Sequence, residues 1–366
     1  MEKTQSSTPM AVSSFDPEFL QAHAELWNLT FSYLKAMALE CAIKLGIPNI
    51  IHCCGGGASL SELVNSSPVP EIRKPHLPRL MRFLVAVGIF SLDIPTIEVE
   101  TTEKAVGIYR LTPLSRLLVD DAISGVDGHG SLSPFVLSQT TKYHVSAAMH
   151  LSDWFMSEDK EVAIEMPFKA AHGTDLWGVM GRDANMNKVF NAGMGSDSRL
   201  AIDFVISKCG EVFDGISSLV DVGGGTGTTA RAIAKAFPHI KCSVLDLPNV
   251  INTITADGIV DIFYMIGTMM IVLTQCKNAI HSTKAGGKVI IIDIVVGSPS
   301  NDMFEAQVLF DLLMMVITSG KERDQKEWHK LFMETGFSHY KTKSVLGFLS
   351  ITELLGCTQT HLTQEN

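Results

Sequence analysis

The chain has 366 residues, which exceeds a typical single domain and favours two domains. Its formal net charge of -10 at pH 7 argues against a nucleic-acid partner or an anionic membrane, so a neutral or cationic small molecule fits better. No apolar run reaches the ~18 residues that span a bilayer, and residues 1–15 are too polar for a signal peptide. The seven cysteines are scattered without a CxxC pair, which predicts reduced thiols, a cytoplasmic location and no metal site.

The first part of the chain predicts a small helical domain. Apolar residues recur at three- and four-residue steps over residues 17–47, and Ser59 offers a helix start. Residues 75–92 predict a second apolar helix, and residues 97–111 resemble a short strand ribbon. Helices followed by a ribbon are typical of a winged-helix-like module, which we place at residues 17–120.

The rest of the chain, residues 121–366, predicts an α/β domain. Residues 125–130 favour a flexible link, and residues 133–210 are helical in character with loops. Strands are then expected at residues 218–222, 241–247 and 288–296, with a helix at 229–237. Alternating strands and helices indicate a parallel sheet that is covered on both faces. Residues 356–366 predict a polar tail without a packed strand.

A glycine-rich turn lies where the first of these strands meets the helix. Gly223, Gly225 and Gly227 let the backbone approach a ligand closely at a helix N-terminus. Asp246 follows at the end of the second strand, where a carboxylate accepts hydrogen bonds from ribose hydroxyls. The pattern predicts a nucleotide-type ligand, and it departs from the NAD fingerprint because Thr228 stands at that fingerprint's last glycine.

Four sequence runs together resemble the plant S-adenosylmethionine-dependent O-methyltransferases of the caffeate and flavonoid type. They are LVDVGGGTG at 219–227, LDLPNV at 245–250, MNKVF at 186–190 leading to Ser198, and GKER at 320–323. The resemblance covers residues 17–346. It implies a Rossmann-like methyltransferase domain after an N-terminal dimerisation domain, a homodimer, S-adenosyl-L-methionine as cofactor and a phenolic plant metabolite as acceptor.

The resemblance also implies roles for individual residues. The implied cofactor-binding residues are Ser198, Asp221, Gly223, Gly225, Asp246 and Met269. The implied acceptor-binding residues are Trp177, Phe190, Met194 and Met315. Asp293 and Glu322 would support the catalytic base. The alternatives are core packing for the pocket side chains, a cap or surface hydroxyl for Ser198, a strand-end turn for Asp293 and a helix cap for Glu322.

The catalytic base itself is missing from the sequence. Methyl transfer to a phenol needs a deprotonated oxygen, because a phenol of pKa ~10 is mostly neutral at pH 7. In the family a histidine of a His-Asp-Trp motif takes that proton, but this chain has no histidine between His239 and His281. Thr268 stands at the acidic position of a family turn, and the segment that follows the turn in the family is absent. Other histidines, namely His129, His144, His150 and His172, are expected on the surface or in the core with hydrogen-bond partners.

The missing segment leaves two arrangements of the sheet open. Residues 268–282 follow helical spacing and predict one crossover helix. Residues 259–266 then either take the central place in the sheet or stay at its edge, which leaves a gap with exposed apolar surface.

Three functions follow from these observations. The first is an O-methyltransferase for a phenylpropanoid, flavonoid or alkaloid phenol, with weak or absent activity. The second is a non-catalytic family member that binds cofactor or pairs with an intact relative. The third, which the glycine spacing disfavours, is an NAD dehydrogenase.

Overall fold

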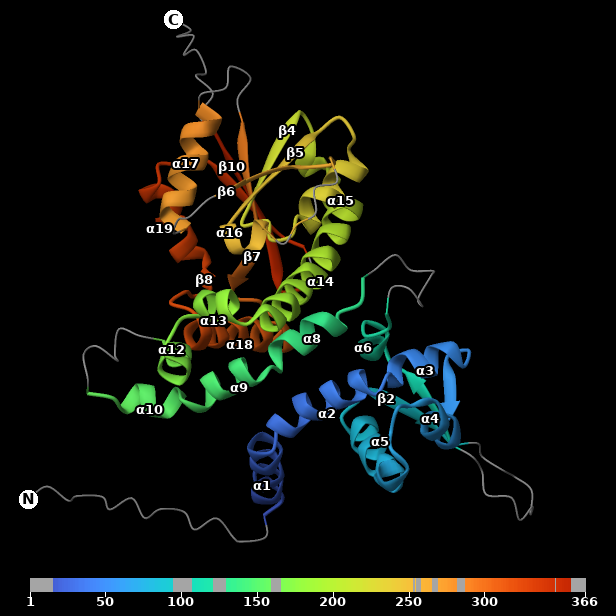
Figure 1. Ribbon diagram of the computed structural model, residues 1–366. Helices are drawn as coiled ribbons and strands as arrows, with labels where there is room; N and C mark the ends of the chain where they lie inside the picture. The colour runs from blue at the N-terminus through green and yellow to red at the C-terminus, as the bar shows by residue number, and fades with distance from the viewer. Residues whose placement is uncertain are drawn as a thin grey trace, which may run out of the picture. The chain divides into compact units, whose positions relative to one another are not determined.

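The computed structural model describes residues 16–94, 107–120, 130–158, 166–252, 254, 258–264, 269–281, 287–345 and 347–356. The chain divides into two compact units, Met1–Val119 and Asp120–Asn366 (Figure 1). Over the described ranges, no helix is long and apolar enough to cross a bilayer. Nor do these ranges bring together three His, Cys, Asp or Glu side chains that could hold a metal ion.

The first unit packs short helices against a small antiparallel sheet. Its helical segments are α1 (Pro17–Thr30), α2 (Tyr33–Lys44), α3 (Ile47–Cys53), α4 (Leu60–Ser66), η1 (Glu71–His76), α5 (Leu77–Ala86) and α6 (Pro113–Arg116). Its strands β1 (Gly57–Ser59), β2 (Phe90–Asp93) and β3 (Ile108–Leu111) lie in the order β1-β3-β2. Leu63, Met81 and Phe90 are fully or almost fully buried in its core. The resemblance of this unit to a winged helix stays a prediction.

Local signals set the ends of two helices in this unit. Ser59 begins α4 with a capping box, in which Ser59 and Glu62 each accept a hydrogen bond from the other's backbone N–H. The predicted helix over residues 75–92 is wrong beyond Ala86. Gly88, with a φ of 77°, takes the left-handed conformation that ends a helix, and β2 follows.

The second unit begins with a layer of helices, as predicted for residues 133–210. They are α8 (Ser133–Gln139), α9 (Lys142–Met149), α10 (Leu151–Met156), α12 (Pro167–His172), α13 (Leu176–Arg182), α14 (Ala184–Cys209) and the short η2 (Gly210–Phe213). Phe168, Met180 and Met186 are buried in the core of this layer, together with Val316 and Ile317. The expected link at 125–130 and His129 fall almost entirely outside the described residues.

A parallel three-stranded sheet follows the helical layer. It consists of β4 (Ser218–Val222), β5 (Lys241–Asp246) and β6 (Asp261–Tyr264), in the order β4-β5-β6. The helices α15 (Thr228–Ala236) and α16 (Pro248–Ile251) follow β4 and β5. The register sets Asp221 opposite Val244, so the carboxyl ends of β4 and β5 lie together.

A second, four-stranded sheet contains the most apolar strand of the chain. Its strands β7 (Lys288–Val296), β8 (Arg323–Asp324), β9 (Tyr340–Ser344) and β10 (Leu349–Leu355) lie in the order β8-β7-β10-β9. Strand β10 runs antiparallel to both neighbours, so the expectation of a parallel sheet is wrong for this part. Strand β10 ends at Leu355, before the predicted polar tail, and residues 357–366 lie outside the described residues.

Helices cover this second sheet. They are α17 (Met269–His281), α18 (Asn301–Ile317) and α19 (Gln325–Glu334). Leu273 of α17 and Trp328 and Phe332 of α19 share one core with Leu354 of β10, on the side of the sheet where Figure 1 draws both helices. The helix predicted at residues 268–282 is confirmed within the described residues.

The two sheets of this unit do not join through the described strands. Within the described part of the chain, strand β4 pairs only with β5, and β6 lies at the opposite edge, so β6 does not take the central place. The arrangement with a gap is therefore the one that the structure adopts. Ile351 of the four-stranded sheet nevertheless shares a buried core with Val244 of β5. Val220 of β4 stays 52% exposed, which is unusual for valine in a parallel sheet.

Candidate active site

The glycine loop folds back onto the end of β5. The backbone N–H groups of Gly223 and Gly224 both donate to the carbonyl oxygen of Leu245, at 2.7 and 3.3 Å. The N–H of Gly225 donates to Oδ2 of Asp246 at 2.7 Å, and the N–H of Leu247 donates to Oδ1 of the same carboxylate at 2.6 Å. The structure thus brings the predicted loop and acid together and fixes the orientation of the Asp246 carboxylate.

Backbone conformation explains why glycines occupy this loop. Gly223, Gly225 and Gly227 have φ values of 73°, 56° and 82°, in the left-handed region that favours glycine. Gly224 is required for a different reason. A Cβ on Gly224 would lie 2.6 Å from Oδ2 of Asp221, so no side chain fits there without a shift.

Asp221 is a buried acid beneath this loop. Burial, with a smaller contribution from Asp246, raises the pKa of Asp221 to about 6 even though a hydrogen bond from the Ala230 backbone opposes the shift. Its Oδ2 atom is buried and has no hydrogen-bond partner among the described residues. Native structures rarely leave such an atom unpaired, so it marks a place for a polar ligand or water.

Helix α14 passes next to the loop at Gly195. A Cβ on Gly195 would lie 3.3 Å from Oγ1 of Thr228, the first residue of α15. Ser198 follows about one helical turn later and lies on the same side of α14. Burial raises the pKa of the neighbouring Asp197, an acid that the sequence had not indicated.

The predicted acceptor side chains are partly brought together. Phe190, Met194 and Ser198 recur at four-residue steps on α14, which places them along one face. Trp177 of α13 meets Phe190 edge to face, with 6.2 Å between ring centroids, and is 45% exposed. Phe190 packs against the core that contains Val316 and Ile317, which directly follow Met315 on α18.

The histidines near these side chains have mainly hydrogen-bonding roles, as predicted. His150 Nδ1 lies 2.8 Å from the Ser146 carbonyl oxygen, and His172 Nε2 lies 3.0 Å from the Tyr143 carbonyl oxygen. His144 is buried and its ring is parallel to that of Phe190. Burial, with a contribution from His172, lowers the pKa of His144 to about 4, so this imidazole is neutral at pH 7.

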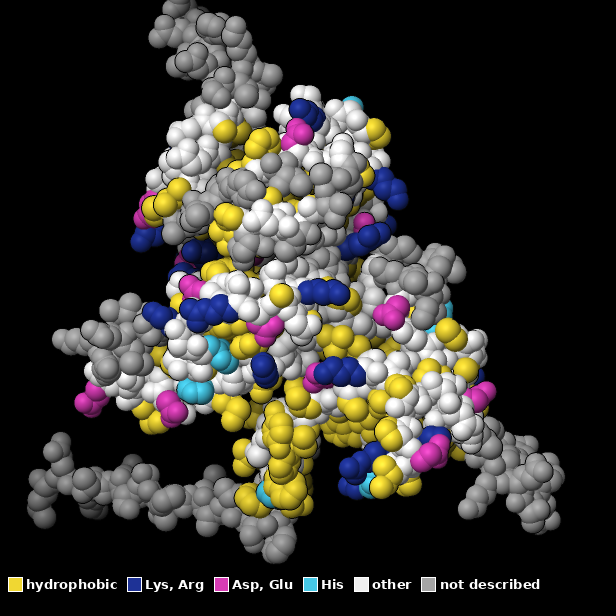
Figure 2. Space-filling model, viewed as in Figure 1, with side chains coloured by type: hydrophobic (Ala, Val, Ile, Leu, Met, Phe, Trp, Pro, Cys, Tyr) yellow, Lys and Arg dark blue, Asp and Glu magenta, His cyan; other side chains and the backbone are white. Residues whose placement is uncertain are grey.

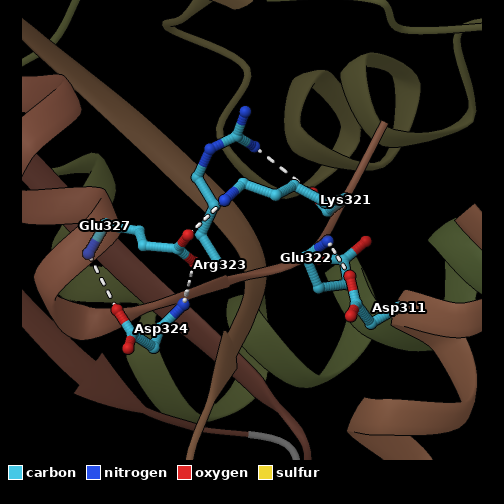
Figure 3. A network of polar contacts seen from close by, with 6 residues as sticks. All are labelled: Asp311, Lys321, Glu322, Arg323, Asp324 and Glu327. Atoms are coloured by element: carbon cyan, nitrogen blue, oxygen red, sulfur yellow. Dashed lines mark hydrogen bonds and ion pairs between the residues drawn. The ribbon is translucent and has the colours of Figure 1, made fainter. Parts of the chain in front are cut away.

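Asp293 and Glu322 lie in a cluster of acids. Asp293 is in the middle of β7, opposite Ser350, and not at the strand end as expected. Glu322 does not cap a helix either, since Asp324 caps α19. The backbone N–H of Glu322 instead donates to Oδ1 of Asp311 on α18 at 2.8 Å (Figure 3). No sequence pattern pointed to Asp311, because only the fold brings it to Glu322.

This cluster changes the proton affinity of its members. Burial, followed by the charges of Asp293 and Asp311, raises the pKa of Glu322 to about 7. Burial also raises the pKa of Asp293. Glu322 can therefore gain or lose a proton near neutral pH.

Met269 is the remaining predicted cofactor residue. It is the first residue of α17 and is 38% exposed. The turn that precedes it, residues 265–268 with Thr268, lies outside the described residues. Its role stays a prediction.

Two family models match the chain. An O-methyltransferase domain matches residues 149–260 and 264–338, and an O-methyltransferase dimerisation domain matches residues 27–121. The first match is interrupted between residues 260 and 264, at β6.

Relatives from grasses match along almost the whole chain. A flavonoid O-methyltransferase-like protein of Oryza sativa subsp. japonica is 40% identical over 367 residues, covering 93% of this chain and 96% of the relative. A 5-pentadecatrienyl resorcinol O-methyltransferase of Sorghum bicolor is also 40% identical, covering 94% of this chain and 99% of the relative. The alignment with the rice relative spans more positions than the number of residues of this chain that it covers. Some residues of that relative therefore have no counterpart in this chain.

Solved structures share the fold. Human N-acetylserotonin methyltransferase in complex with SAM has a TM-score of 0.69 at 17% identity, covering 95% of this chain and 100% of that chain. A methyltransferase of calicheamicin biosynthesis in an SAH-bound form has a TM-score of 0.68 at 20% identity, covering 93% and 99%.

Proposed function

This chain belongs to the O-methyltransferase family, and we propose that it binds S-adenosyl-L-methionine and methylates the hydroxyl group of a phenolic plant metabolite. The observation that carries the proposal is the hydrogen bond between the glycine loop and the Asp246 carboxylate, at the carboxyl ends of β4 and β5. Parallel α/β sheets bind their ligands at such ends. The printed names of the rice and sorghum relatives, a flavonoid-type and a resorcinol methyltransferase, support a phenolic acceptor.

The residues present fit this cofactor. The Asp246 carboxylate keeps acceptor capacity for ribose hydroxyls beyond its two backbone hydrogen bonds. The unpaired Oδ2 of Asp221 offers a further acceptor, and the absence of side chains at Gly223 and Gly225 permits close approach. Ser198 on α14 would contact the amino-acid end. When bound, the cofactor supplies an electrophilic methyl group.

The acceptor would lie against the α14 face and the end of α18. We propose that Trp177, Phe190, Met194 and Met315 line its site, since Trp177 and Phe190 meet edge to face and Phe190 packs against the end of α18. Aromatic and methionine side chains suit a planar phenolic ring. The identity of the phenol and the position of methylation depend on differences of a few kcal/mol in that pocket.

Activity should be low, because the family's histidine base is missing. A positioned base contributes roughly 10²–10⁴-fold to such a reaction. The interruption of the family match at β6 and the gap between the two sheets both support the loss of that segment. Asp293 and Glu322 remain, without the histidine they would support.

A second candidate function is pairing with another chain. Helix α1 has no buried residue, and Leu26, Trp27 and Leu29 are 60, 57 and 72% exposed. Figure 2 shows hydrophobic side chains gathered over α1. The match to a dimerisation domain supports an association through this unit, and we propose a homodimer or a pair with an intact relative.

The cellular setting is a further proposal. The six cysteines at described positions are free, and Cys41, Cys53 and Cys54 are exposed. Exposed free thiols suit the reducing cytoplasm, and the net charge of -10 does not favour a nucleic-acid partner.

One set of experiments separates these functions. Isothermal titration with S-adenosylhomocysteine tests the cofactor site, and a radiolabelled methyl-transfer assay on a panel of phenols tests the activity. Light scattering, alone and after co-expression with an intact relative, tests the pairing. Cofactor binding with weak transfer supports the first function, cofactor binding or pairing with no transfer supports the second, and binding of NAD instead overturns both.

A further inference from the structure

The surroundings of the Glu322 side chain differ from those expected of an acid that only supports another catalytic residue. Glu322 is only 9% exposed. Among the described residues, no side chain or backbone group donates a hydrogen bond to the Glu322 carboxylate. The hydrogen bond that fixes it runs from its own backbone N–H to Asp311. This hydrogen bond fixes the Glu322 backbone, and the carboxylate keeps its capacity to accept hydrogen bonds or a proton.

The nearest cations are engaged elsewhere. The guanidinium of Arg323 lies over the Trp328 ring, 5.4 Å from its centre, and donates to the Lys321 carbonyl oxygen. The Lys321 ammonium pairs with Glu327 of α19 (Figure 3). Among the described residues Glu322 therefore has no ion-pair partner, although the Arg323 charge partly offsets the repulsion from Asp293 of β7 and Asp311 of α18.

The position of the cluster connects it with the acceptor residues. Asp311 and Met315 are four residues apart on α18 and share one face of that helix. The same helix ends in Val316 and Ile317, whose core includes Phe190. A phenol bound against Phe190 and Met315 would thus lie close to the acids.

Resting on the proposed function, we propose that Glu322 is itself the catalytic base that takes the proton from the acceptor hydroxyl. The O–H bond of the phenol breaks, the proton bonds to a carboxylate oxygen of Glu322, and the electron pair stays on the phenol oxygen as phenolate. Asp311 is a positioning residue, which holds the Glu322 backbone and supplies negative charge. The proton leaves Glu322 to solvent after transfer.

The charge environment makes Glu322 the best remaining base. Proton transfer from a phenol of pKa ~10 is unfavourable by about 10³ for a base of pKa about 7, but by about 10⁶ for one of pKa about 4. His144, whose pKa is lowered to about 4, is the weaker candidate. This difference explains why the residual activity should not be zero.

The test uses the full chain and four variants. Glu322→Gln removes the base, Glu322→Asp shortens it, and Asp311→Asn removes a neighbouring charge. Glu305→Gln, an exposed acid on the same helix, is the control. We measure the pH dependence of kcat and KM, the affinity for S-adenosylhomocysteine, and the protonated-carboxyl infrared band of the wild type minus Glu322→Gln.

The expected results are specific. The infrared band should vanish as the pH rises through about 7, and kcat should rise over the same interval. Glu322→Gln should lose about 100-fold or more in kcat with unchanged cofactor affinity, Glu322→Asp should recover part of it, and Asp311→Asn should move both titrations to lower pH. Glu305→Gln should match the wild type.

Two results would overturn the proposal while leaving the proposed function intact. In the first, the Glu322→Gln variant keeps the wild-type kcat. In the second, Glu322 titrates near neutral pH but kcat does not change over the same pH interval. Cofactor binding without any transfer to phenols would overturn the proposal and the methyltransferase activity. Failure to bind S-adenosylhomocysteine would overturn the cofactor assignment as well.

Discussion

The backbone N–H of Gly225 donates a 2.7 Å hydrogen bond to Oδ2 of Asp246, so the glycine loop and the acid after β5 hold each other in place. Two segments that are 21 residues apart thereby form one structure before any ligand arrives. A site that is already organised loses less entropy on binding.

Replacing Asp246 by alanine should weaken S-adenosylhomocysteine binding about 10- to 100-fold, because hydrogen bonds to a charged group contribute roughly 1.5–3 kcal/mol. Isothermal titration measures the change. Asp261→Asn on β6, an exposed acid that pairs with Lys241, is the control and should bind normally. Equal affinity in Asp246→Ala would show that the acid does not contact the cofactor.

Replacing Gly224 by alanine should lower the free energy of unfolding by roughly 1–3 kcal/mol, as overpacking does. The added Cβ would lie 2.6 Å from Oδ2 of Asp221, a contact that real side chains do not make. Gly181→Ala on α13 meets nothing within 4 Å and should be neutral or slightly stabilising. Denaturant unfolding of the two variants compares them directly, and equal stability would mean that the loop relaxes freely.

The pKa of Glu322 predicts how stability changes with pH. Between its ordinary value of 4.5 and about 7, the unfolded chain has released this proton while the folded chain keeps it. The folded state binds more protons there, so Glu322 contributes stability below pH 4.5 that is lost as the pH rises to about 7. At pH 8, Glu322→Gln should therefore be more stable than the wild type by on the order of 1–3 kcal/mol, and at pH 4 the two should agree.

Thermal or denaturant unfolding at both pH values, with Glu305→Gln alongside, measures this difference. A Glu322→Gln variant that is less stable than the wild type at pH 8 would mean that the ionised carboxylate has a favourable partner.

The gap beside β4 predicts a tendency to aggregate, because an unpaired strand edge can pair with another chain. Val220→Lys, which places a charge on the 52% exposed position of β4, should reduce this aggregation and leave S-adenosylhomocysteine binding unchanged. Light scattering over a concentration series measures it. Ile72→Lys in η1 removes another exposed apolar side chain, and an equal benefit from it would rule out the sheet edge as the cause.

Local patterns predicted much of this fold. The helical spacing of residues 268–282 gave α17, Ser59 and Glu62 marked the start of α4, and the run at 219–227 located the glycine turn. The glycine at position 88 was also a readable signal, and overlooking it extended α5 too far.

The sequence alone could not predict which distant segments pair with one another. The position of β6 depends on which strand lies beside it, and its own residues fit a central or an edge place. The raised pKa of Glu322 needs Asp293 and Asp311, which come from β7 and α18. Strand β10 was missed because the family resemblance weakens just before it.

The central claim is that the chain keeps its cofactor site but lacks the segment with the histidine base. The most direct test inserts the corresponding segment of the rice relative between β6 and α17 and compares methyl transfer by the two proteins. At matched S-adenosylhomocysteine affinity, the restored chain should turn over a phenol roughly 10²–10⁴-fold faster. A folded, cofactor-binding restored chain that is no faster than the original would contradict the claim.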